Sequence, residues 1–202
     1  MTKIDFKKTL KHLYKPSKNE ISIVDVPAMN FLMIDGQGNP NTAKSFTEAI
    51  ETLYAVSYNL KFMIKKTQQI DYVVLPLEAL WWAEEMAEFS ETDKDSWLWT
   101  AMIMQPEYVS NNLVMEAIET VRAKKGAMAL DKLRFESLKE GKSAQVLYIG
   151  PYSEEGPSIQ NIHKHIDALG GTLAGKHHEI YLSDARRTAP EKLKTIIRQP
   201  FK

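Results

Sequence analysis

The sequence predicts an α+β protein built from two similar halves with antiparallel sheets. Alternating apolar and polar residues mark several short strands, and longer segments with helical periodicity lie between them. The same order, strands followed by a helix and two further strands, occurs twice along the chain. We therefore expect one domain over residues 1–202, made of pseudo-repeats at about 1–106 and 107–202, arranged about a pseudo-two-fold axis with a central ligand pocket.

The composition restricts the class of protein. Of the 202 residues, 44% are hydrophobic and 26% are charged, which is typical of globular domains. Lys and Arg together number 26, as do Asp and Glu, so no net field favours nucleic acid or an anionic membrane. The N-terminus has no apolar signal region, and the absence of cysteine excludes disulfides and thiolate chemistry. We expect a cytoplasmic protein that requires no cofactor and no metal.

The first half contains two strong boundary signals. Pro16 ends an N-terminal helix, and Ser45 with Glu48 has the spacing of a capping box at the start of a long helix. The expected elements are a helix over 4–14, strands over 21–26 and 30–34 paired as a hairpin, a helix over 45–66, a strand over 72–77, an acidic loop over 84–95 and a strand over 96–104.

The second half repeats this order. Pro157 suits the first turn of a helix, and Gly170-Gly171 suits its end. The expected elements are a helix over 111–121, strands over 133–136 and 144–149, a helix over 157–169, a strand over 177–183, a short turn at Pro190 and a last strand ending at 200.

The strand over 177–183 carries the strongest candidate functional residue. Ile180 and Leu182 alternate with Glu179 and Tyr181, so the apolar pair should face helices and the carboxylate with its phenol the opposite side. Partly buried among aromatic residues, Glu179 could act as a base or hold a cation. A sheet face open to water, or a buried Glu179 paired with Arg or Lys, explains the same pattern without function.

Aromatic residues supply the other candidates. Phenols can donate to a ligand carbonyl and stabilise an oxyanion, and indoles can stack on flat or cationic ligands. Each of these residues could equally fill the core. His177 shares the predicted face of Glu179 and could assist it or line a rim. The candidates are Glu179 and Tyr181 as catalytic residues, and Trp82, Trp97, Trp99, Tyr148, Tyr152 and His177 as ligand-binding residues.

The chain resembles the GyrI-like small-molecule-binding family. The resemblance depends on the segments 27–36, 80–83, 147–152, 175–184 and 188–200 and so extends over nearly the whole chain. Ala185 stands where many members have proline, a departure that affects a loop. The family is similar to effector-binding domains of multidrug-sensing regulators, in which a buried glutamate at the position of Glu179 meets cationic aromatic drugs. This chain carries no helix-turn-helix segment, so a regulator role is not implied.

The resemblance implies binding of a small hydrophobic or cationic aromatic ligand. Some stand-alone members hydrolyse the cyclopropane of DNA-alkylating natural products of the yatakemycin type, and others inhibit gyrase. We expect detoxification by hydrolytic opening of an electrophilic cyclopropane. The alternatives are a non-catalytic drug-binding protein and a gyrase-inhibitor-like adaptor, and the sequence leaves the natural ligand and the oligomeric state open.

Overall fold

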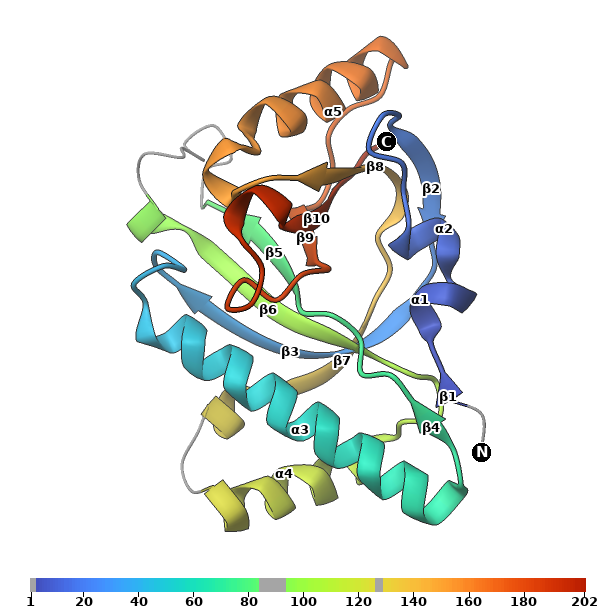
Figure 1. The fold of residues 1–202 in the computed structure, drawn as a ribbon, viewed down its shortest axis with the longest axis vertical. Coiled ribbons are helices and arrows are strands. Elements are labelled where there is room, and N and C mark those ends of the chain that lie inside the picture. Colours follow the sequence, from blue (N-terminus) through green and yellow to red (C-terminus); the bar gives the residue numbers. More distant parts are fainter. Residues whose placement is uncertain (1–2, 84–93, 126–128) are drawn as a thin grey trace. The chain divides into compact units, whose positions relative to one another are not determined.

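The computed structural model describes residues 3–83, 94–125 and 129–202, which form two compact units. The first unit comprises Met1–Phe6 and Met29–Leu138, and the second comprises Lys7–Ala28 and Lys139–Lys202. Both units combine helices with an antiparallel sheet, which confirms the predicted α+β class (Figure 1). Most of the acidic loop expected over 84–95 lies outside the described residues.

The first unit contains a four-stranded sheet in the order β5-β6-β3-β7. Its register places Gly36 opposite Trp99 and Leu32 opposite both Ile103 and Phe135. A separate parallel pair joins the two-residue strands β1 and β4. The strands are β1 (Lys3–Ile4), β3 (Met29–Gln37), β4 (Asp71–Tyr72), β5 (Glu78–Trp82), β6 (Leu98–Gln105) and β7 (Arg134–Leu138).

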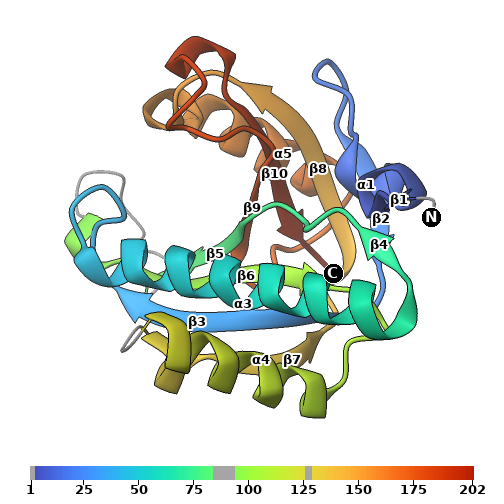
Figure 2. The same cartoon turned by 60° about the horizontal axis from the view of Figure 1, so that its bottom comes forward.

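Helix α3 (Lys44–Gln68) lies along this sheet, and α4 (Asn111–Lys125) packs beside it (Figure 2). The buried stripe of α3 has the three- and four-residue spacing of one helix face. The predicted capping box is wrong, because α3 begins after Ala43 and the described residues show no side-chain cap there. Short 3-10 turns at η2 (Lys94–Ser96) and η3 (Ala129–Lys132) complete the unit.

The second unit contains the sheet β2-β8-β10-β9, also antiparallel. Helix α5 (Gly156–Ala168) lies next to β8, and its Ile162 and Ile166 pack with Val146, Ile197 and Phe201 (Figure 1). Its elements are α1 (Phe6–Thr9, which begins at the unit boundary), α2 (Lys11–Tyr14), β2 (Ser22–Val26), β8 (Gly141–Ile149), η4 (Tyr152–Glu154), α5, β9 (His177–Tyr181), η5 (Pro190–Lys192) and β10 (Lys194–Pro200).

Three local predictions are wrong. The N-terminal helix is divided into α1 and α2 after a two-residue strand. The strand expected over 72–77 is confined to β4, because Pro76 cannot donate to a sheet, and the next strand begins at Glu78. The strands over 21–26 and 30–34 form no hairpin, because β2 pairs with β8 whereas β3 pairs with β6 and β7.

The two units share one strand order although each takes an edge strand from the other half of the sequence. β7 follows residue 107 but pairs with β3, and β2 precedes residue 106 but pairs with β8. The compact units therefore do not coincide with the expected repeats, and the duplication itself stays a prediction.

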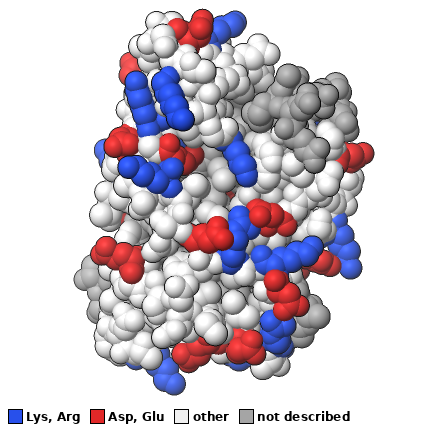
Figure 3. Space-filling model, turned by 180° about the vertical axis from the view of Figure 1, so that it is seen from behind, with Lys and Arg blue, Asp and Glu red and all other residues white. Residues whose placement is uncertain are grey.

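Two surface properties agree with the balanced composition. Acidic and basic side chains are intermixed on the face that Figure 3 shows. Of the helices in the described part of the chain, none combines the length and the apolar character that crossing a bilayer requires.

Candidate functional site

Three of the four tryptophans pack against Phe46 of α3 in the first unit. The Phe46 ring lies 5.0 Å from Trp99 and 5.5 Å from Trp81, and Trp81 lies 5.5 Å from Trp97. Trp99 is 1% exposed and covers Gly36, where an added Cβ would lie 2.1 Å from the indole ring. These contacts make Trp81, Trp97 and Trp99 one aromatic cluster of the unit's core.

Trp82 differs from the other three tryptophans. It neighbours Trp81 along β5 and so points to the opposite face of the strand, where it is half-buried. Its register partner is Leu98, also half-buried. The ligand-binding roles expected for Trp82, Trp97 and Trp99 stay predictions.

Glu179 lies on the face of the second sheet that helix α5 covers. It is the register partner of Ile197, whose side chain belongs to the core formed with Ile162 and Ile166. The sequence had assigned this helix to the face of Ile180, and that assignment is wrong. Alternation separates the two faces of a strand but does not indicate which of them a helix covers.

The carboxylate of Glu179 is buried, 6% exposed, and accepts two hydrogen bonds from its own strand. His177 Nε2 donates to Oε1 over 3.1 Å, and the Tyr181 hydroxyl donates to Oε2 over 2.7 Å. Burial alone would raise the pKa of Glu179, but hydrogen bonds from His177, Tyr181 and Glu155 and the charge of His177 lower it. The site therefore holds an ionised carboxylate almost out of contact with water.

Tyr152 and Tyr148 lie near this carboxylate in different ways. The ring of Tyr152 meets that of Tyr181 edge to face at 5.6 Å. Burial, followed by the charges of Glu179 and Glu155, raises the pKa of Tyr152 to about 12, so its phenol stays protonated. The Tyr148 hydroxyl instead donates to the Pro151 carbonyl over 2.9 Å and fixes the turn before η4.

Sequence reasoning missed Glu155, which directly precedes α5. Its side chain is 8% exposed, and it contributes a hydrogen bond that lowers the pKa of Glu179. A glutamate two residues before the predicted first-turn Pro157 was the available signal, because glutamate is not a preferred N-cap residue.

His163 of α5 extends the polar cluster toward the C-terminal strand. Burial and the charge of the nearby His177 lower the pKa of His163, whereas a hydrogen bond with Gln199 acts in the opposite direction. Among the described residues, no group of three or more His, Cys, Asp or Glu side chains could hold a metal ion.

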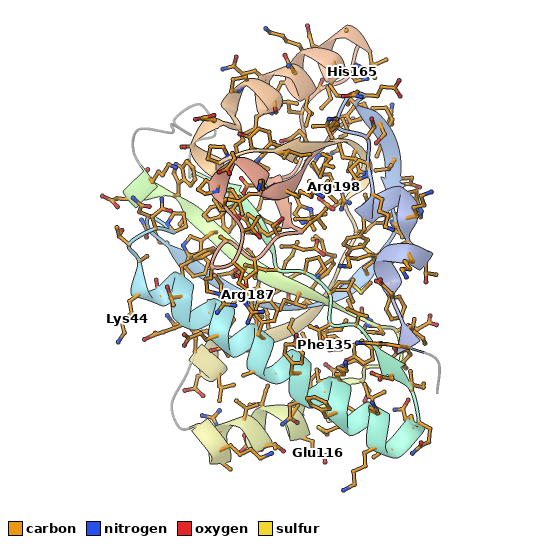
Figure 4. All side chains as sticks on the ribbon, in the orientation of Figure 1. Lys44, Glu116, Phe135, His165, Arg187 and Arg198 are labelled. Atoms are coloured by element: carbon orange, nitrogen blue, oxygen red, sulfur yellow. The ribbon has the colours of Figure 1, made fainter. Side chains whose placement is uncertain are left out.

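A second buried polar network occupies the opposite face of the same sheet. Arg198 is fully buried and donates to Glu140 over 3.0 Å, to Gln145 over 2.9 Å and to the Leu13 carbonyl over 2.9 Å. His178 Nδ1 donates to the other Glu140 oxygen over 2.9 Å. Figure 4 shows Arg198 among packed side chains of the second unit, whereas Lys44 and Glu116 lie at the periphery of the first. This network is structural.

Comparison with solved structures gives clear relatives. The chain is 38% identical to an uncharacterized conserved protein from Listeria innocua, with a TM-score of 0.91, over 98% of this chain and 100% of that one. It is 36% identical to a hydrolase from Listeria innocua, with a TM-score of 0.89 and full coverage of both chains. A second Listeria innocua hydrolase is 35% identical, with a TM-score of 0.86, over 98% of this chain and 100% of that one.

More distant matches agree on the fold. The C-terminal domain of EcmrR is 10% identical with a TM-score of 0.55, over 91% of this chain and 97% of that domain, which shows a shared fold alone. No relative among curated proteins matches significantly. The model of the GyrI-like small molecule binding domain matches residues 19–202. The chain therefore belongs to the GyrI-like small-molecule-binding domain family.

Proposed function

We propose that this protein detoxifies flat, hydrophobic electrophiles in the cytoplasm by hydrolytic opening of a cyclopropane conjugated to a dienone. The observation that carries the proposal is the buried, ionised Glu179, held by His177 and Tyr181. The printed names of two relatives at 36% and 35% identity, both hydrolases, support a hydrolytic reaction. The family as a whole supports a small-molecule ligand.

The proposed reaction requires one base and one donor. Glu179 takes a proton from water as the water oxygen bonds to a cyclopropane carbon. The carbon–carbon bond breaks, its electron pair moves through the ring to the dienone oxygen, and protonation there gives a phenol. Release of ring strain and gain of aromaticity drive the step, so the balance calls for no cofactor.

Tyr181 has a defined part in this proposal. Its hydroxyl proton points at Glu179 Oε2 in the structure, and a ligand carbonyl must compete for that proton. Once the proton turns to the carbonyl, Tyr181 stabilises the developing oxyanion, and Glu179 becomes a stronger base. Tyr152, Tyr148 and the indoles of Trp82, Trp97 and Trp99 are proposed to contact the flat ring system.

The test is incubation of a spirocyclopropyl cyclohexadienone with the protein, followed by mass spectrometry. We expect a product one water heavier than the substrate, and at least a 100-fold slower reaction in Glu179→Gln. Glu154→Gln is the matched control, because Glu154 is exposed and lies outside the cluster. Unchanged compound bound stoichiometrically would refute hydrolysis and support the second candidate, a drug-binding protein, which the family's small-molecule binding favours. In that case Glu179→Gln should weaken binding of cationic ligands above all.

A further inference from the structure

The N-terminal turn of α5 presents an unusual carboxyl group. Glu155 occupies the N-cap position but is only 8% exposed, although glutamates are rarely buried. N-cap side chains usually accept a hydrogen bond from the helix backbone. Within the described part of the chain, the Glu155 side chain makes no such cap. Its burial therefore has another cause.

That cause is the second carboxyl group on β9. The Glu155 side chain is hydrogen-bonded to Glu179, and the phenol of Tyr152 lies close enough to be affected by the charges of both. Two carboxyl groups can form a hydrogen bond only if one of them carries a proton. Glu179 already accepts from His177 and Tyr181, so Glu179 is the ionised partner and Glu155 the donor.

We propose that Glu155 and Glu179 form a carboxylic acid–carboxylate pair sharing one proton, in which Glu155 is the general acid and Glu179 the base. The inference rests on the proposed hydrolysis and deepens it, because it assigns the proton that the dienone oxygen must receive. The fitting substrates are neutral molecules with an acceptor oxygen conjugated to the bond that breaks.

The pair balances the reaction without an external proton donor. Water gives one proton to Glu179 and its oxygen to carbon, the ring bond breaks, and Glu155 gives its proton to the dienone oxygen. After this step Glu179 holds the proton and Glu155 is ionised. Transfer across the hydrogen bond between the two carboxyl groups restores the starting state.

The surroundings of the pair suit a single negative charge. The titratable groups that face it are His177 and Tyr181 on β9, Tyr152 before α5, and His163 of α5 beside His177. Asp184 also acts on Tyr152 and adds negative charge. A second ionised carboxylate would be repelled by the first in this buried position. A cationic ligand would stabilise the doubly ionised pair, so its binding should release a proton.

The kinetic test uses Glu155→Gln, which keeps an N–H donor toward Glu179 but has no acidic proton. We expect kcat for the cyclopropanoid to fall at least 100-fold, with ligand Kd changed less than about threefold. The basic limb of the pH–kcat profile should also disappear, because that limb reports loss of the Glu155 proton. Glu154→Gln should keep both limbs. A Glu155→Gln protein with wild-type kcat and an unchanged profile would overturn the acid role.

A second measurement requires no substrate and no variant. Carbon-detected NMR titration of side-chain carboxyl groups in the wild-type protein should show Glu155 protonated and Glu179 ionised at pH 7. Both groups ionised at pH 7 would overturn the pair, even if Glu179 proved essential for hydrolysis. A shared proton together with no hydrolysis of any cyclopropanoid would overturn the proposed function and the acid role, and leave the pair as a cation site that releases a proton on binding.

Discussion

Substitution of Glu140 by Gln should strongly destabilise the second unit. Glu140 accepts hydrogen bonds from Arg198 and His178, and the Arg198 side chain is 0% exposed. Burial opposes ionisation of Glu140, but attraction to His178 and Arg198 and their hydrogen bonds outweigh it and lower its pKa to about 2. The drop from 4.5 corresponds to about 3 kcal/mol of stability. Removing one partner of a buried ion pair costs about 3–5 kcal/mol.

The pH dependence has a definite sign. The unfolded chain binds the Glu140 proton more tightly than the folded chain, so the stabilisation is complete above pH 4.5 and is lost as the pH falls toward 2. Urea unfolding followed by far-UV circular dichroism, from pH 7 to pH 3, measures it. Glu140→Gln should lower the free energy of unfolding at pH 7 by about 3 kcal/mol and flatten its fall below pH 4.5.

Asp35→Asn in the first unit provides a matched comparison. Asp35 pairs with Arg134 over 2.6 Å, but its side chain is 54% exposed, so its loss should cost under about 1 kcal/mol. Equal effects of Glu140→Gln and Asp35→Asn would refute the reasoning, because burial would then make no difference to the value of an ion pair.

Three further substitutions test the core and the site. Ile162→Ala should lower the free energy of unfolding by about 2–5 kcal/mol, since Ile162 is 0% exposed, whereas Ile149→Ala at 40% exposure should cost little; similar losses would contradict the core assignment. Gly36→Ala should cost about 1–3 kcal/mol and alter the near-ultraviolet circular dichroism, because the new Cβ meets the Trp99 ring; an unchanged spectrum argues against that contact. Burial of Tyr152, with the charges of Glu179 and others, raises its pKa to about 12, so stability should fall from pH 10 toward 12, and Tyr152→Phe should reduce that fall in alkaline urea titrations.

Local chemistry predicted most elements of the fold. Pro157 and Gly170 gave the limits of α5 nearly correctly, and the period of apolar residues gave α3 to within a few residues. These signals work because they depend on neighbours within one helical turn. The pairing of β2 with β8 depends on residues more than a hundred positions apart, such as Ser22 and Gln145. Proximity in sequence favoured a hairpin instead.

The candidate site divides in the same way. The pairing of Glu179 with Tyr181 followed from alternation on one strand, and the structure joins them by a hydrogen bond. Glu155 could not be found, because its approach to Glu179 depends on where α5 packs. The face that α5 covers was also predicted incorrectly, for the same reason.

The crossed placement of β2 and β7 makes the chain a natural split protein. A fragment ending near residue 106 would keep β3 without β7, and the remaining fragment would keep β8 without β2. Each fragment would have an open sheet edge and a surplus strand, a combination that favours aggregation when either is expressed alone. Co-expressed, the two fragments have complementary gaps and should rebuild both sheets. A reporter divided at this point would signal only when both fragments are made together.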